Sequence, residues 1–204
     1  MKTNDLSKYD KLVEKSTGYK AFLYDCDGTL ADNMPAHALT YIKVAADRGV
    51  NITGEIIDEL AGWPVPAVVV EINKRYNSNL DPEEFAEVRQ QLYHDEYIDR
   101  ITAVEHVVEH LKAHYGKVRI AVVSGGSREA VEKTLKVLGI YNLVETMVCA
   151  GETPNGKPYP DPFLAAAQKL GVDPKDCLVF EDGDPGVRSA IAAGMDWVRI
   201  DQLD

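Results

Sequence analysis

The chain has few cysteines, no long apolar runs and little positive charge. Its three cysteines, Cys26, Cys149 and Cys177, are scattered and odd in number, which argues against a disulfide framework and a zinc cluster. No apolar run approaches the ~18–20 residues needed to span a bilayer. Residues 1–20 are mostly polar and lack the apolar centre of a signal peptide. A reducing, cytoplasmic location is therefore expected, with no membrane partner.

Basic residues are outnumbered, with 22 Lys and Arg against 33 Asp and Glu and a net charge of −11. This balance disfavours nucleic acid and anionic membrane surfaces as partners. An anionic substrate would need local positive charge or a metal ion. The 45% hydrophobic fraction among 204 residues is ordinary for a globular protein, either one large domain or a core with a smaller insertion. A monomer is expected.

Five short apolar runs predict buried strands. Because they are continuously apolar rather than alternating, they favour a parallel sheet covered on both faces. From about residue 104 to the end, strands alternate with helical patterns, which predicts a doubly wound parallel-sheet α/β core. The runs are Ala21–Tyr24, Val118–Val123, Met147–Ala150, Leu178–Phe180 and Trp197–Ile200.

The stretch from Met34 to Ile101 has no convincing strand. It carries helical patterns around residues 36–48, 67–76 and 82–99, the last with a good helix start at Asp81-Pro82. A helical subdomain placed after the first strand is expected to cap the carboxyl end of that strand.

The predicted organisation is therefore an α/β core of residues 1–33 and 102–204 with a helical cap of residues 34–101 inserted into it. Residues 1–18 carry a few apolar side chains among charges. They are expected to form a short outer helix or a loose arm.

Polar residues cluster where the predicted strands end, at residues 25–29, 124–127 and 181–184. In open parallel sheets, ligands bind in the crevice at the carboxyl ends of the strands. The three clusters therefore predict one pocket. Up to four carboxylates would meet there, which is costly unless a cation joins them or some are protonated. Oxygen ligands of this kind suit Mg²⁺. The four acids are Asp25, Asp27, Glu181 and Asp182.

The same pocket has features that favour an oxyanion such as phosphate. Gly125 and Gly126 offer backbone N–H groups, and Ser124 offers a hydroxyl. Lys157, in the loop after the third strand, supplies a positive charge. A carboxylate nucleophile, magnesium, a lysine and an anion cradle together indicate phosphoryl transfer through an aspartyl-phosphate.

Four motifs in this order resemble the haloacid dehalogenase-like (HAD) superfamily of phosphotransferases. They are Asp25–Leu30, Val123–Gly125, Lys157–Asp161 and Phe180–Asp182. The resemblance extends from about Tyr19 to the C-terminus and includes a helical cap after the first motif.

The resemblance implies a role for each motif residue. Asp25 would be the nucleophile, and Asp27 would protonate the leaving oxygen and then deprotonate the attacking water. Thr29 and Ser124 would help to hold the phosphoryl group, and Lys157 would balance the charge of nucleophile and phosphate.

Magnesium would be bound by Asp25, by the backbone carbonyl of Asp27 and by Asp182. Glu181 would ligate the ion directly or support a residue that does. Asp184 is read as a helix N-cap, with a supporting role at the metal left open.

Three further residues are candidates for substrate binding. Gly125 belongs to the anion cradle. His37 stands where related sugar-phosphate enzymes have a histidine, at the junction of core and cap. Trp63 is read equally well as a cap core residue or as a plate facing the substrate.

The cap type and the Glu181-Asp182 pair are similar to the β-phosphoglucomutase and sugar-phosphate phosphatase branch. The segment Cys177–Gly194 looks like phosphatases of the fructose-1-phosphate and phosphogluconate kind. The mutases carry an arginine just after the glycine of a cap loop, where this chain has Gly62-Trp63 and no basic residue before Lys74. Hydrolysis of a small phosphorylated metabolite is therefore preferred over a mutase.

Two other functions are weighed. A dehalogenase is disfavoured because Asp27, the acid for a phosphate ester's leaving group, is present. A non-enzymatic phospho-acceptor module, like a response-regulator receiver domain, would share the acidic pocket, the magnesium and the lysine. The cap insertion and Asp27 argue against it.

Overall fold

The computed structural model describes residues 3–60 and 63–203, which form two compact units. One contains the residues up to Asp32 and from Thr102 onward, and the other contains Asn33–Ile101. Among the described residues, no helix is both long and apolar enough to cross a bilayer.

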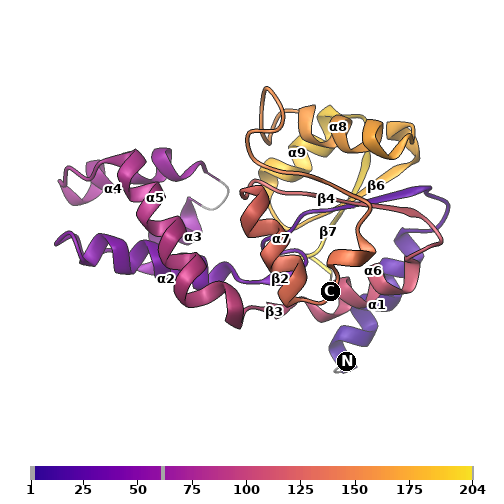
Figure 1. Ribbon diagram of the computed structural model, residues 1–204, viewed down its shortest axis with the longest axis horizontal. Coiled ribbons are helices and arrows are strands. Elements are labelled where there is room, and N and C mark those ends of the chain that lie inside the picture. The colour runs from indigo at the N-terminus through magenta and orange to yellow at the C-terminus, as the bar shows by residue number, and fades with distance from the viewer. Residues whose placement is uncertain (1–2, 61–62, 204) are drawn as a thin grey trace. The chain divides into compact units, whose positions relative to one another are not determined.

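The larger unit is a five-stranded parallel sheet with helices on both faces, in the order β5-β4-β1-β6-β7 (Figure 1). The predicted α/β fold is confirmed. The strands are β1 (Ala21–Tyr24), β4 (Arg119–Val123), β5 (Thr146–Val148), β6 (Cys177–Glu181) and β7 (Asp196–Arg199). The helices are α1 (Thr3–Lys15), α6 (Glu105–His114), α7 (Arg128–Val137), α8 (Asp161–Leu170) and α9 (Asp184–Ala192), with short 3₁₀ turns at Tyr141–Leu143 and Pro174–Asp176.

Both faces of the sheet are buried, which explains the continuous apolar runs. Successive side chains of a strand point to opposite faces. Phe22 accordingly packs in the core that contains Leu111 of α6, and its neighbour Leu23 packs in the core that contains Phe163 of α8. Each of these four side chains is almost completely buried.

The predicted strand Met147–Ala150 is shorter than expected, since β5 ends at Val148. The amide of Ala150 instead donates to the carbonyl of Gly126, 2.9 Å away, so the chain turns toward the segment after β4. The sequence reading also missed an antiparallel pair of two-residue strands, β2 (Ala31–Asp32) and β3 (Thr102–Ala103), which are too short to show a pattern.

The N-terminal segment is a helix, α1, rather than a loose arm, and its Leu12 is fully buried. After α1, a chain of buried hydrogen bonds links Ser16, His110 and Tyr24. The Ser16 hydroxyl donates its one hydrogen to the Val13 carbonyl. In the contact with Nε2 of His110, 2.9 Å away, the hydroxyl oxygen is therefore the acceptor. The Tyr24 hydroxyl, 2.8 Å from Nδ1 of His110, is then the donor to that atom. The imidazole therefore joins α1, β1 and α6 in its neutral form.

The smaller unit is helical and has its own core, which includes Tyr41, Val44, Ile72 and Phe85. No strand occurs in the part of it that the structure describes. Its elements are α2 (Met34–Ala46), α3 (Gly54–Glu59), α4 (Val65–Tyr76) and α5 (Pro82–Leu92), then a π-helical turn (Tyr93–Tyr97) and a 3₁₀ turn (Ile98–Arg100).

The helices of this unit differ from the prediction in two ways. The helix α3 was not predicted. The helix predicted over residues 82–99 begins as expected, where the Asp81 carboxylate accepts from the amides of Glu83 and Glu84. The α-helix ends at Leu92, and the chain stays helical beyond it as the π-helical turn Tyr93–Tyr97 and the 3₁₀ turn Ile98–Arg100.

Candidate active site

The polar residues at the strand ends meet at the carboxyl edge of the sheet, because the strands that carry them are neighbours. Asp25 and Ser124 continue the ladders of β1 and β4 by one residue. The Asp25 amide donates to the Phe180 carbonyl on β6, and the Ser124 amide donates to the Val148 carbonyl on β5, each over 2.9 Å.

Lys157 is the cationic centre of this edge. Its Nζ donates to Oδ1 of Asp25 and to Oε1 of Glu181, each at 2.6 Å, and to the Val123 carbonyl at 2.8 Å. Its side chain is only 12% exposed. A buried ammonium with three acceptors holds the ends of β1, β4 and β6 to the loop that follows β5.

The charges at this edge shift one another's protonation. Burial raises the pKa of the Asp25 carboxyl well above its usual range; Lys157 opposes the rise, and Glu181, Asp182 and Asp27 add to it. Burial, with Glu181 as the next cause, raises the pKa of Asp182 from 3.8 to about 6. Burial lowers the pKa of Lys157, but Asp25 and Glu181 outweigh this effect and raise it, so the lysine stays charged.

Three carboxylates could hold a metal ion here. One oxygen from each of Asp25, Glu181 and Asp182 lies within 4.8 Å of the others. Burial is the main cause of the raised pKa values of Asp25 and Asp182, and the neighbouring carboxylates add to it. An all-oxygen donor set of this kind fits a hard divalent cation.

The acidic cluster depends on two glycines. A Cβ on Gly28, which has a φ of +85°, would lie 2.2 Å from Oδ2 of Asp182. A Cβ on Gly186 would lie 1.7 Å from Oε1 of Glu181. The sequence reading missed Gly186, for which the only available signal was a glycine soon after the Glu181-Asp182 pair.

Thr29 is completely buried, and its hydroxyl donates to Oδ1 of Asp182 at 2.9 Å. Its expected role in holding the phosphoryl group stays a prediction, and the structure adds its contact with this carboxylate. Asp184 is not the N-cap of α9, because Gly183 occupies that position. Its 85% exposed side chain pairs with Arg199 and is not part of the three-carboxylate cluster.

The segment after β4 is the one predicted to form an anion cradle. The Gly126 amide donates to the Ser124 hydroxyl oxygen at 2.9 Å, and Gly125 is exposed. A Cβ on Gly126 would lie 3.5 Å from Oδ2 of Asp27, so this carboxylate faces the same segment. Asp27, Ser124 and Gly125 are thus brought to one place.

The two cap candidates lie in the helical unit. The His37 ring stacks on Tyr93 with 4.1 Å between centroids, and its Nδ1 lies 3.2 Å from an Nη1 of Arg89. Because arginine only donates, Nδ1 is the acceptor. Trp63 is 53% exposed and therefore is not a core residue. The preceding Gly62, on which the mutase comparison depends, lies outside the described residues.

The chain resembles known proteins in family, sequence and structure. The model of the haloacid dehalogenase-like hydrolase family matches residues 19–194. The fructose-1-phosphate phosphatase YqaB of Escherichia coli (strain K12) is 31% identical over 185 residues, which cover 89% of this chain and 96% of that protein.

Two solved structures are similar. A predicted phosphoglycolate phosphatase from Haemophilus somnus superposes with a TM-score of 0.79 at 25% identity, over 90% of this chain and 85% of that one. A HAD family hydrolase from Deinococcus radiodurans, with bound phosphate and sodium, has a TM-score of 0.69 at 28% identity, over 88% and 80%. The chain belongs to the haloacid dehalogenase-like hydrolase family and is a phosphatase enzyme.

Proposed function

We propose that the protein is a magnesium-dependent phosphatase that hydrolyses a small phosphorylated carbohydrate through an aspartyl-phosphate on Asp25. The observation that carries the proposal is the contact of a buried carboxylate, Asp25, with Lys157 inside a three-carboxylate cluster. A nucleophilic carboxylate must be ionised, and Lys157 acts in that direction because it opposes the rise that burial causes in the pKa of Asp25.

The other residues act around that carboxylate. Asp25, Asp182 and Glu181 would hold the cation, together with the backbone carbonyl of Asp27. When bound, the cation offsets the charge of the phosphate and orients it. The Asp27 side chain would give a proton to the leaving oxygen and then take one from water. Ser124 and the amide of Gly125 would donate to the phosphoryl oxygens.

We further propose that the helical unit is a cap and that it selects the substrate, with His37 and Trp63 as contact residues. A relative that is a fructose-1-phosphate phosphatase supports a sugar phosphate of the fructose-1-phosphate or phosphogluconate type. Bound phosphate in the Deinococcus protein supports an oxyanion site in this fold.

The test is phosphate release from fructose-1-phosphate, phosphogluconate and an aryl phosphate, with Mg²⁺ and after EDTA treatment. We expect turnover of at least one sugar phosphate with Mg²⁺, none with EDTA, and a near-complete loss in Asp25→Asn, whose amide is a poor nucleophile. Substantial turnover by Asp25→Asn, or by metal-free enzyme, would contradict the mechanism.

A second assay separates the alternatives. β-Glucose-1-phosphate with a bisphosphate primer is followed for both glucose-6-phosphate and free phosphate. The proposal expects free phosphate. Rapid glucose-6-phosphate formation with little phosphate release would establish the mutase, and a stable phosphorylated protein without turnover would establish a phospho-acceptor module.

A further inference from the structure

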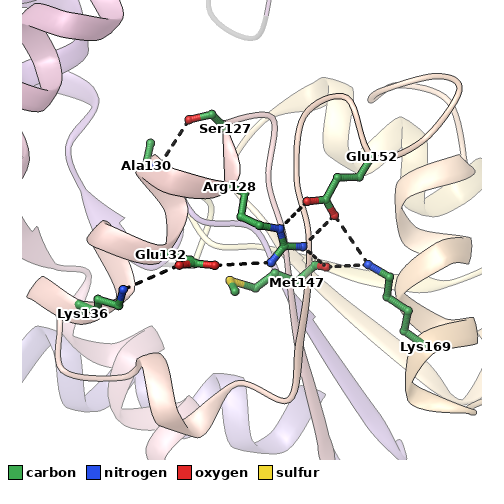
Figure 2. Close-up of polar contacts among 8 residues, drawn as sticks. All are labelled: Ser127, Arg128, Ala130, Glu132, Lys136, Met147, Glu152 and Lys169. Atoms are coloured by element: carbon green, nitrogen blue, oxygen red, sulfur yellow. Dashed lines mark hydrogen bonds and ion pairs between the residues drawn. The ribbon is translucent and has the colours of Figure 1, made fainter.

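Beside the anion cradle lies a network of charged side chains that the catalytic roles above leave unused (Figure 2). Arg128 is the first residue of α7, directly after the cradle, and Glu152 lies in the loop that leads to Lys157. Nε of Arg128 donates to Oε1 of Glu152 at 2.6 Å, and Nη2 donates to Oε2 at 2.8 Å. Two hydrogen bonds between guanidinium and carboxylate fix the relative orientation of the two side chains as well as their separation.

The network also holds the end of β5. Nη2 of Arg128 donates to the Met147 carbonyl at 3.1 Å, and Nζ of Lys169 on α8 donates to the same carbonyl at 3.0 Å. Lys169 further pairs with Glu152 at 3.7 Å. Figure 2 shows Glu152 between the two cations, so the loop after β5 is attached to both α7 and α8.

Glu152 is the point from which the chain leaves this network for the active site. Pro154, Asn155 and Gly156 are exposed, and Lys157 then enters its buried position between Asp25 and Glu181. The path of the loop from Glu152 therefore affects the position of the Lys157 ammonium.

The pair contributes little to the stability of the fold. Its side chains are 43% and 26% exposed, and exposed ion pairs contribute only about 0–1 kcal/mol. Geometry at a reacting centre is more demanding, since a displacement of about 1 Å can slow a reaction ~100-fold. An interaction of modest strength can thus have a measurable effect on rate while the fold stays intact.

We propose that Arg128 and Glu152 are positioning residues, which set the path of the loop so that the ammonium of Lys157 reaches Asp25. This inference rests on the proposed function for its kinetic consequence. Neither residue touches the reacting atoms in this scheme, and both act through Lys157.

The kinetic test compares Arg128→Met, Glu152→Gln and the charge exchange Arg128→Glu/Glu152→Arg. We expect each single variant to lower kcat about tenfold, within the range that misplacement produces, with KM changed less and the melting temperature nearly unchanged. The charge exchange should recover part of kcat. The control is Lys136→Met, which removes the ion pair with Glu132 at 3.7 Å and the contact with the Tyr141 ring but leaves Arg128 and Glu152 unchanged.

A second measurement needs no turnover. Acetylation of lysines by acetic anhydride is followed at each site by mass spectrometry. Lys157 should be protected in the wild type and in Lys136→Met, and acetylated faster in Arg128→Met. If the wild type hydrolyses no sugar phosphate, the proposed function fails while this labelling still tests the pair. Unchanged labelling, or a normal kcat of Arg128→Met in an active enzyme, overturns the inference.

Discussion

Glu181 packs directly against the backbone of Gly186, which leaves no room for a side chain there. Alanine at this position would place a methyl group 1.7 Å from Oε1 of Glu181, so the carboxylate must move away from Lys157. We expect Gly186→Ala to lose most phosphatase activity and about 1–3 kcal/mol of stability through overpacking. Activity assays and thermal melting check both effects.

Gly183→Ala is the matched control for this substitution. Its Cβ would meet Cδ of Pro185 at 3.6 Å and Oε2 of Glu181 at 3.8 Å, which are ordinary contacts. The backbone there is extended, with φ −110° and ψ 147°, so alanine fits. If Gly186→Ala behaved like Gly183→Ala, the packing of Glu181 against this glycine would not matter for the site.

At the scale of elements, α1, β1 and α6 are joined through a histidine that must stay neutral. Burial, with His114 as a lesser cause, lowers the pKa of His110 from 6.5 to about 3. Below pH 6.5 the unfolded chain binds a proton that the folded protein does not. The stability associated with the neutral His110 is therefore complete above pH 6.5, and it is lost as the pH falls from 6.5 toward 3.

We expect unfolding at pH 5 to cost about 2 kcal/mol less than at pH 7 on account of His110. Urea denaturation at a series of pH values measures the slope. His110→Gln should be less stable at pH 7 but should show a flatter dependence between pH 6.5 and 5. His94→Gln, on a 36% exposed side chain, is the control and should keep the wild-type slope. An unchanged slope in His110→Gln would show that other groups are responsible.

The elements themselves could largely be predicted from sequence, because the central strands, such as β1 and β6, are buried on both faces and so form continuous apolar runs. Ala21–Tyr24 was predicted with its observed bounds for this reason. Helix starts were harder to place. Asp184 is predicted to be an N-cap, but it is the first helical residue of α9, since Pro185 occupies the second position rather than the first.

The convergence of acids and lysine could be predicted as well, because parallel strands end at one edge. The contacts that depend on how separate loops pass one another could not. Thr29 with Asp182 and Arg128 with Glu152 each join segments whose spacing in sequence carries no signal.

At the scale of the whole molecule, a protein of net charge −11 concentrates three acids at one buried point. Raising the pKa of Asp182 to about 6 means that its ionisation opposes folding. As the pH rises through that value, metal-free protein loses stability, by up to about 3 kcal/mol for this one group. A bound cation removes the penalty.

We therefore expect Mg²⁺ to raise the melting temperature of the wild type at pH 7.5. Asp182→Asn should melt higher than the wild type without metal, because the buried charge is gone, and should respond weakly to Mg²⁺. Asp184→Asn is the control, since that exposed acid lies outside the cluster and should leave the Mg²⁺ response intact. A Mg²⁺ response of Asp182→Asn equal to the wild type's would place the ion elsewhere.

The order of the sheet also has a consequence for synthesis on the ribosome. β1, which leads directly into the proposed nucleophile Asp25, is made first of the five strands, yet its neighbours pair with it through Arg119 and Cys177, far later in the chain. Until β6 has emerged, β1 has at least one open edge, and such an edge is a template for wrong pairing. A nascent chain that stops before Glu181 would also leave Lys157 without one of its two carboxylate partners. The proposed catalytic centre is thus assembled only when the last third of the protein has been translated.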